Sequence, residues 1–267
     1  MKSNKERISL GEMRSLQLGI LKVVHDFCKQ NNIRYSLGGG SLLGAVRHQG
    51  YIPWDDDIDI MMPRPDYDRF IKLFEGFHSI YQIQTCYNDD TYFYPFAKVY
   101  DNRTVAQELL VRTGVFIDVC PIDGLPNKEE TRLYLKELTR IVYKELYYSA
   151  KTYKIREGNK PILFMKYLVK RCMVPKREKC LSDLTSLVHS YDFSLSEYVG
   201  GICGRNGMKE HMPASVFEHY ISVPFEGYYF MAISEYDYYL KSLYNEYMKL
   251  PPEEDRIARH DLKVFWK

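Results

Sequence analysis

Residues 38–63, GGGSLLGAVRHQGYIPWDDDIDIMMP, gather three consecutive glycines and four aspartates into one short stretch of the chain. The segment IRYSL before the glycines is predicted to be a short strand. SLLGAVRH is predicted to be a helix whose N-cap is Ser41 or a neighbouring glycine. DIDIMM then has the character of a second strand. This order of strand, glycine turn, helix and strand predicts an α/β fold built around the aspartates.

The aspartates themselves predict a cation site. Side chains alternate along a strand, so Asp57 and Asp59 are expected on one face of it. Two carboxylates on one face repel each other unless a cation lies between them. Paired carboxylate oxygens are hard ligands that suit Mg²⁺ or Mn²⁺ rather than zinc.

The glycine turn predicts a phosphate-binding element beside the cation. Gly39 and Gly40 allow the backbone to approach a ligand closely, and the first amides of the following helix would face a phosphate, helped by the Ser41 hydroxyl. Arg47 and His48, at the other end of this helix, would add positive charge for a second phosphate. A plain helix cap is the alternative explanation, and the nearby Asp-x-Asp pair favours phosphate binding.

A third carboxylate is needed if metal ions, or one metal and a general base, are to support phosphoryl transfer. Asp118 is the candidate, because it lies in GVFIDVCPIDG with apolar neighbours on both sides, as expected for a strand that holds a buried charge for a purpose. Asp123 competes for this role. Its surroundings, PIDGLP, have turn composition, so we interpret Asp123 as a turn residue.

The first half of the chain contains further α/β elements. Residues 9–30 follow a helical period, and Ser9 with Glu12 forms a capping box. PDYDRFIKLFEGF is predicted to be a helix, and strands are predicted at YQIQTC, FAKVY and VFIDVC. The second half is mainly helical from residue 128 to the basic segment described below. Near its end we expect a strand or hairpin at FEGYYFMAI and a helix capped by Ser234 and stopped by Pro251-Pro252.

These elements predict an α/β (α+β) fold with a mixed sheet flanked by helices. We divide the chain into a catalytic core, residues 1–126, and a mainly helical C-terminal lobe, residues 127–267, that packs on the core. One continuous domain is the alternative to this division.

Composition is that of an ordinary globular protein, with 267 residues, 45% of them hydrophobic and 27% charged. The sequence contains no apolar run approaching the ~20 residues of a membrane span, and its first residues lack the apolar core of a secretory signal. Six cysteines without a C-x-x-C pair fit reduced thiols. We therefore expect a cytoplasmic protein.

One segment is strongly cationic. Residues 151–180 carry ten Lys or Arg residues and two Glu residues, and the apolar residues of PILFMKYLVKRCMV recur at helical spacing. A basic amphipathic helix of this kind can lie on an anionic membrane surface, at the inner face of the membrane. A solvated helix face above a core stripe is the alternative, and we favour it. No nucleic-acid-binding motif accompanies the charge, so nucleic acid is not expected as a partner.

The glycine pair with serine, the Asp-x-Asp strand and the later strand aspartate together resemble the nucleotidyltransferase superfamily. More narrowly, GGSLLGAVRHQGYIPWDDDIDIMMPRPDYDRF is similar to the LicD family of phosphocholine transferases. The similarity continues through FAKVYDNRT and FIDVCPIDGLP and returns in FEGYYFMAISEYDYYLKSLYNEYMKLPPEEDR and the following His260. It is weakest over residues 130–200.

This resemblance implies a nucleotidyltransferase-like fold and a Mg²⁺-dependent phosphotransferase. The implied reaction moves phosphocholine from CDP-choline to a sugar hydroxyl of a cell-surface glycan precursor, of teichoic acid or lipopolysaccharide type and lipid-linked. Fukutin-type enzymes, which transfer ribitol phosphate, share the same core, so another CDP-alcohol is an alternative donor.

The resemblance also implies roles for individual residues. Asp57 and Asp59 would hold the metal at the donor pyrophosphate, and Asp118 would be a further ligand or the general base. Lys98 and Arg47 are the cations expected to stabilise the transferred charge. Choline recognition requires aromatic faces, and Trp54 is the aromatic residue expected to line the pocket. His260 matches a histidine of the family, although an exposed or capping histidine is the alternative.

Two other classes of function remain as alternatives. A nucleotidylyltransferase, which moves a nucleoside monophosphate to a small molecule or protein, uses the same metal core. A non-catalytic glycan- or nucleotide-binding protein is the other alternative, and the three aspartates argue against it because an anionic cluster is costly to retain without a use.

Overall fold

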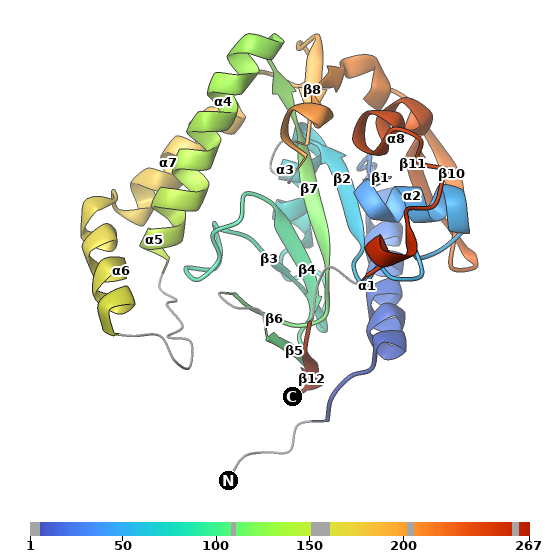
Figure 1. Cartoon of the computed structure of the whole chain (residues 1–267), viewed down its shortest axis with the longest axis horizontal. Coiled ribbons are helices and arrows are strands. Elements are labelled where there is room, and N and C mark those ends of the chain that lie inside the picture. Colours follow the sequence, from blue (N-terminus) through green and yellow to red (C-terminus); the bar gives the residue numbers. More distant parts are fainter. Residues whose placement is uncertain (1–5, 108–110, 151–160, 202–205, 258–261) are drawn as a thin grey trace.

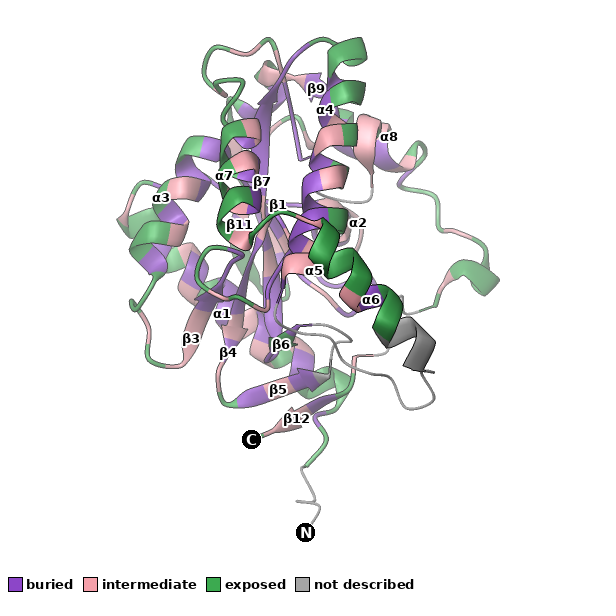
Figure 2. Ribbon diagram, turned by 90° about the vertical axis from the view of Figure 1, so that its left-hand side faces the viewer, coloured by how far each residue is buried: buried purple, intermediate pink, exposed green. Residues whose placement is uncertain are grey.

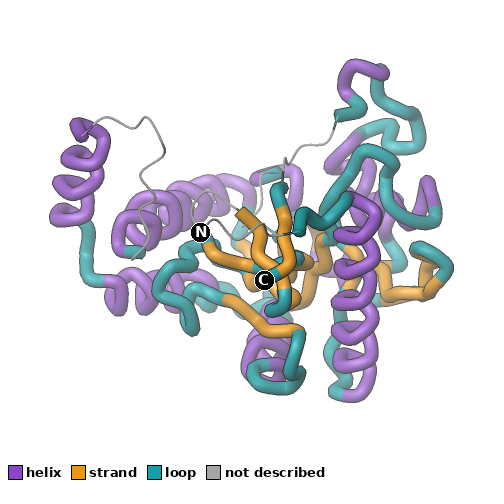
Figure 3. The backbone as a smooth tube through the Cα atoms, turned by 90° about the horizontal axis from the view of Figure 1, so that it is seen from below, coloured by secondary structure: helices purple, strands orange, loops and turns teal. Residues whose placement is uncertain are grey.

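The computed structural model describes residues 6–107, 111–150, 161–201, 206–257 and 262–267. These residues form a central mixed sheet with helices on both sides of it (Figure 1 and Figure 3). The predicted fold class, a mixed sheet flanked by helices, is confirmed.

The central sheet has seven strands. Its main path runs in the order β1 (Ser36–Leu37), β2 (Asp59–Pro63), β7 (Phe116–Leu125), β4 (Ala97–Asp101) and β3 (Tyr81–Gln84). β8 (Tyr198–Gly200) pairs with the last residues of β7 and with β9 (Met212–Pro213). β2 and β7 are parallel, and the other pairs are antiparallel. β7 is therefore the strand that joins all parts of the sheet.

Two smaller sheets complete the strands. β12 (Val264–Trp266), β5 (Thr104–Gln107) and β6 (Arg112–Thr113) form one of them. β10 (Tyr220–Phe225) and β11 (Tyr228–Ile233) form a hairpin, which confirms the expectation for FEGYYFMAI. β5 and β6 were not predicted, because both are short and β5 also pairs with the distant β12.

The long N-terminal helix, α1 (Leu10–Gln30), packs against β4 and β7. Its predicted capping box is confirmed: the Ser9 Oγ accepts a hydrogen bond from the Glu12 N–H, and the Glu12 carboxylate accepts one from the Ser9 N–H at 2.8 Å. Its inner face, with Ile20, Leu21 and Val24, is fully buried in the main core (Figure 2). Local capping and the helical period therefore agree with the tertiary packing.

Two helices flank β2 along the chain, α2 (Gly39–His48) before it and α3 (Arg64–Phe74) after it. The N-cap of α2 is Gly38, so a neighbouring glycine rather than Ser41 begins the helix. The strand, glycine turn, helix and strand that the sequence predicted are all present.

The first part of the second half is a run of helices. These are α4 (Lys128–Arg140), the π-helical η1 (Ile141–Leu146), α5 (Tyr147–Ser149), α6 (Pro161–Met173) and α7 (Arg177–Val188). α4, η1 and α7 share a second, smaller hydrophobic core, which includes Tyr134, Leu138, Ile141, Val142, Leu146, Cys180, Leu184 and Val188.

Residues from 198 onward return to the main core. β8 joins the central sheet, the hairpin β10–β11 contacts β1 and α2, and α8 (Tyr236–Tyr244) packs on α2. The short 3-10 helices η2 (Gly207–Glu210), η3 (Ala214–Phe217) and η4 (Glu253–Asp255) connect these elements. The division of the chain at residue 126 stays a prediction.

Two details of the predicted C-terminal helix are wrong. The N-cap of α8 is Glu235, and Ser234 instead extends the hairpin, since its N–H donates to the His219 carbonyl at 2.8 Å. The helix ends at Tyr244, because Asn245 adopts a positive φ of 56°, well before Pro251-Pro252.

The interpretation of Asp123 as a turn residue is also wrong. Asp123 lies inside β7, paired with Gly200 of β8, and its side chain is buried. Its Oδ1 accepts a hydrogen bond from the Arg64 Nε at 2.5 Å. Asp123 is therefore half of a buried ion pair that joins α3 to the sheet.

No helix among the described residues combines the length and the apolar character needed to cross a membrane.

Candidate active site

The register of the central sheet brings three charged side chains into one row. Asp59 of β2 is the Cα partner of Asp118 of β7, and Asp118 is in turn the partner of Lys98 of β4. Residues that are partners across neighbouring strands project to the same face of a sheet. The Lys98 Nζ lies 2.7 Å from the Asp118 Oδ1. The structure therefore brings Asp59, Asp118 and Lys98 together on one face. We call these three residues the acidic row.

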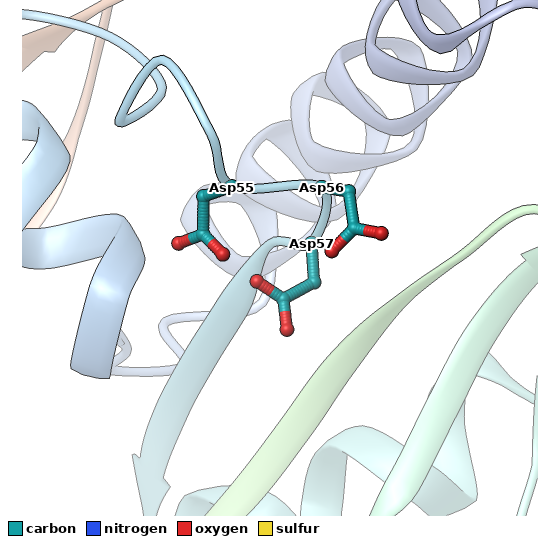
Figure 4. A group of neighbouring side chains, drawn as sticks. All are labelled: Asp55, Asp56 and Asp57. Atoms are coloured by element: carbon teal, nitrogen blue, oxygen red, sulfur yellow. The ribbon is translucent and has the colours of Figure 1, made fainter. Parts of the chain in front are cut away.

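A second group of acidic residues, Asp55–Asp57, lies directly before β2 and is called the acidic loop. Asp55, Asp56 and Asp57 each offer a carboxylate oxygen, and these oxygens all lie within 4.8 Å of one another (Figure 4). The backbone of this loop is fixed by α1, because the Gln17 amide donates to the Asp56 carbonyl at 2.9 Å and the Arg14 guanidinium donates to the Pro53 carbonyl at 2.9 Å. The three carboxylates are therefore held in place by the core.

Aspartates of the acidic row and of the acidic loop both raise the pKa of one carboxyl group, that of Asp59. Burial raises the pKa of Asp59 well above its ordinary value, and the nearby charges of Asp57, Asp118 and Asp55 raise this pKa further, against the opposing effect of Lys98. A bound cation would relieve this repulsion. Oxygen-only donor sets of this kind fit Mg²⁺ or Mn²⁺. The residues present therefore fit the predicted metal, and they add Asp55 and Asp56 to the predicted ligands Asp57, Asp59 and Asp118.

The glycines at the start of α2 lie close to two of the carboxylates. A Cβ atom on Gly40 would lie 2.6 Å from the Asp55 Oδ2, so a larger residue there would displace this carboxylate. Gly39 has a positive φ of 47°, which favours glycine. The two glycines therefore leave room for Asp55 and provide the backbone conformation with which α2 begins.

Ser41 has a different position from the one expected of a phosphate ligand. It is buried, and its Oγ accepts a hydrogen bond from the Asp59 N–H at 2.9 Å. The Gly39 N–H donates to the Tyr239 hydroxyl at 3.2 Å. Ser41 therefore holds the first residue of β2 against α2, beside the site.

These residues surround one large cavity of about 1250 Å³. The four aspartates of residues 55–59 and Asp118 line it, together with Gly39, Gly40, Arg47, Trp54 and Lys98 from the predicted set. The structure therefore gathers most of the residues that the sequence selected around a single space, large enough for a nucleotide and a sugar.

The predicted cations differ in their surroundings. The Arg47 guanidinium donates to the Tyr247 carbonyl at 2.6 Å, which anchors the loop after α8 to α2. Lys98 is buried, and its Nζ lies 3.4 Å from the centre of the Phe116 ring. Lys98 is therefore fixed by both a carboxylate and an aromatic face.

His48 lies beside the cavity rather than in its lining. Its Nε2 accepts a hydrogen bond from the Arg47 Nε at 2.9 Å, and its ring stands edge-on to Trp54 at 6.4 Å. Burial and the neighbouring Arg47 charge lower the pKa of His48. His260 lies outside the described residues.

Glu210 also lines the cavity, and it was not predicted from the sequence. Glu210, at the end of η2, is buried, and its Oε1 accepts a hydrogen bond from the Asn206 amide at 2.7 Å. Burial raises the pKa of Glu210 to about 7. Among the residues that the structure describes, no salt bridge neutralises it. No local motif marks this glutamate, so composition and spacing alone gave no signal for it.

Two tyrosines of the C-terminal region, Tyr239 and Tyr244, lie near the start of α2, and Tyr239 is close enough to both Glu210 and Asp59 for their charges to affect its pKa. Tyr239 is fully enclosed, and burial raises its pKa well above the ordinary value, with further contributions from Glu210, Tyr244 and Asp59. A Cβ on Gly39 would lie 3.7 Å from the Tyr244 hydroxyl. α8 and the residues that follow it therefore close the cavity over the start of α2.

This combination of a mixed sheet, a glycine-led helix and strand aspartates defines a nucleotidyltransferase-type site. A family model described as LicD/FKTN/FKRP, nucleotidyltransferase domain, matches residues 32–155, which include both acidic groups. The lipopolysaccharide cholinephosphotransferase LicD of Haemophilus influenzae is 33% identical to this chain over 262 residues, which cover 96% of this chain and 97% of that protein. The chain belongs to the LicD family.

Shorter similarities extend to other bacteria. An uncharacterized protein of Rickettsia typhi is 40% identical over 76 residues, 28% of this chain and 25% of that protein. An uncharacterized protein of Rickettsia prowazekii is 48% identical over 62 residues, 23% of each chain.

Proposed function

We propose that this chain transfers phosphocholine, or a related phosphoalcohol, from a CDP-activated donor to a sugar hydroxyl of a cell-surface glycan precursor. The proposal is supported by the near-complete match to a lipopolysaccharide cholinephosphotransferase. The single observation that carries it is the row of Asp59, Asp118 and Lys98 beside the acidic loop, in a cavity of about 1250 Å³. The acceptor is of lipopolysaccharide or teichoic acid type.

A divalent cation, Mg²⁺ or Mn²⁺, would be held by Asp57, Asp59 and Asp118, with Asp55 and Asp56 within reach of the same site. When bound, it would neutralise charge on the donor diphosphate. Lys98 pairs with Asp118, which fixes the direction of this carboxylate. Arg47 supplies a further positive charge to the cavity wall.

The acceptor must lose a proton during the transfer, and we assign this proton to Glu210. The acceptor oxygen forms a bond to the phosphorus of phosphocholine, the bond from that phosphorus to CMP breaks, and CMP leaves with the electron pair. The acceptor proton moves to the Glu210 carboxylate. A pKa of about 7 suits a general base at neutral pH. Asp118 is less suited to this role, because its Oδ1 is already paired with the Lys98 Nζ.

Choline would bind to aromatic faces, since a quaternary ammonium has no hydrogen-bond donor. Trp54, Tyr94, Tyr143 and Tyr244 line the cavity. The Arg256 guanidinium lies 5.8 Å from the Trp54 ring, so a cation already lies near this ring. We propose Trp54 as one face of the choline site.

We place the reaction in the cytoplasm, at the inner face of the membrane, where a lipid-linked acceptor would be presented. Mg²⁺ dependence, the CDP-choline donor and this location are parts of the proposal.

The deciding experiment incubates the purified protein with Mg²⁺ and a panel of CDP-alcohols, and follows CMP release by mass spectrometry. CMP release with CDP-choline, and a phosphocholine group on a glycan acceptor, is the expected result. Release of pyrophosphate from a nucleoside triphosphate, with a nucleotide on the product, would instead indicate a nucleotidylyltransferase. Binding of CDP-choline without turnover of any donor would indicate a non-catalytic binding protein.

A further inference from the structure

Helix α6 carries an apolar stripe on its outer side. Met165, Val169 and Met173 are spaced four residues apart, so they share one face, and their exposed fractions are 58%, 55% and 79%. A helix on the surface of a globular protein ordinarily turns apolar residues toward the core and polar residues toward water. At these three positions α6 instead exposes apolar side chains to water. Figure 2 shows α6 largely in the colour of exposed residues.

The stripe is held in this direction by the contacts of the inner face. Tyr167 is buried, and its hydroxyl donates to the Ala150 carbonyl at 3.2 Å. The Arg171 guanidinium donates to the same carbonyl at 3.0 Å, and the Lys170 Nζ donates to the Tyr148 hydroxyl at 3.1 Å. Because these contacts fix the rotation of the helix, the stripe cannot turn inward without losing them.

The surroundings of the stripe are cationic. Residues 161–180 contain six Lys or Arg residues and one acidic residue, Glu178. Lys166 is exposed and follows Met165 by one residue, which places it along one edge of the stripe. Lys170 is exposed on the same side of the helix, although its Nζ also donates to the Tyr148 hydroxyl. An apolar stripe bordered by lysines complements a surface with an apolar interior and negative headgroups.

We infer that the outer face of α6 is a docking surface for an anionic lipid bilayer. Of the two interpretations of the basic segment, the solvated face therefore does not explain the exposed stripe, and the membrane surface does. The inference does not depend on the proposed reaction, because it rests on side chains outside the cavity.

The test measures co-sedimentation of the full chain with vesicles of equal parts phosphatidylglycerol and phosphatidylcholine. The variant Met165→Ser/Val169→Ser/Met173→Ser is expected to bind at least about tenfold more weakly, because the apolar contact is lost. Lys166→Gln is expected to weaken binding about fivefold and to reduce its dependence on salt. Vesicles of phosphatidylcholine alone are expected to bind weakly.

The matched control is Leu133→Ser/Leu195→Ser, which removes two other exposed leucines outside α6 and should leave vesicle binding unchanged. Thermal unfolding checks that each variant is folded. Equal binding of the triple serine variant and the unsubstituted protein would overturn the inference, as would equal binding to both kinds of vesicle. If sedimentation velocity shows a dimer that the triple variant loses, and vesicles are not bound, the stripe is an interface between copies of the chain and the inference is wrong.

Discussion

The strands that carry the acidic row and the helices α4 to α7 use their side chains in opposite ways. In the sheet, β2, β4 and β7 place charged residues toward a cavity and apolar residues into the main core. In the helical run, the apolar residues of α4, η1 and α7 form a separate small core, and α6 turns apolar side chains outward. The sheet therefore has the features that the proposed reaction requires, and α6 has those of the proposed docking surface.

The largest effect is expected in the sheet, for Asp59→Asn. Loss of one carboxylate from the proposed metal site should reduce CMP release from CDP-choline by about a thousandfold. The melting temperature in the absence of metal should rise, because the substitution relieves the repulsion that raises the pKa of Asp59. Steady-state kinetics and thermal unfolding are the measurements.

Glu178→Gln, an exposed glutamate of α7, is the control for Asp59→Asn and should leave both quantities unchanged. Full activity of Asp59→Asn would remove the acidic row from the mechanism and with it the contrast between the two regions.

The next largest effect is expected for Glu210→Gln, in the lining of the same cavity. The variant should lower kcat by about a hundredfold, because the acceptor proton has lost its base. In the unsubstituted protein kcat/KM should rise with pH through about 7, as the Glu210 carboxyl ionises, and the variant should lose this rise. The pH dependence of kcat/KM, measured for both proteins, is the test. An unchanged profile would return the role of base to Asp118.

The raised pKa of Glu210 also predicts how the free energy of unfolding depends on pH. Its pKa of about 7 in the folded protein lies above the 4.5 of an ordinary glutamate, so the unfolded chain releases the proton first as pH rises. The free energy of unfolding should therefore fall by roughly 3 kcal/mol between pH 4.5 and 7, relative to Glu210→Gln. Urea unfolding of both proteins at several pH values measures the difference. A constant difference across this range would contradict the burial of an ionisable Glu210.

A matched pair of valines compares the two cores directly. Val119 in β7 and Val142 in η1 are both fully buried, one in the main core and one in the small helical core. Each Val→Ala substitution should lower the free energy of unfolding by about 2 kcal/mol. Val119→Ala should also reduce activity, because Val119 adjoins Asp118. Val142→Ala should reduce activity less, because its neighbour Tyr143 lines the cavity but does not belong to the row of Asp59, Asp118 and Lys98. Equal loss of activity in both variants would show that the helical run shapes the active site as strongly as the sheet does.

The smallest effect is expected at the start of α1. Ser9→Ala removes the cap that accepts the Glu12 N–H, and it should lower the free energy of unfolding by about 1 kcal/mol without changing kcat. Thermal unfolding and CMP release measure these two quantities. A loss of activity would mean that α1, which fixes the acidic loop through Gln17, transmits the change to the site.

Local patterns of the sequence predicted the elements around the acidic loop well. The capping box of α1 and the glycine start of α2 depend on neighbours a few residues away, and both are present. Asp118 was selected because apolar residues flank it, and it indeed lies in a strand beside Asp59.

Distant partners could not be predicted in the same way. Asp123 has a turn-like neighbourhood, but its partner Arg64 lies far away in the chain and makes it a buried strand residue. Ser234 resembles a helix cap, but pairing with His219 keeps it in the hairpin. Two positions with clear local signals were therefore misinterpreted because a tertiary contact outweighed the local preference.

The sequence alone determined the acidic stretch, the glycines next to it and the type of most elements, because periodicity, capping and charge repulsion act between neighbours in the chain. Only the tertiary structure decided that Lys98 pairs with Asp118, that Glu210 faces the same cavity and that the apolar stripe of α6 points outward. Strand register and helix packing set these relations. They depend on the mutual fit of surfaces far apart in the chain, for which no single segment carries the information.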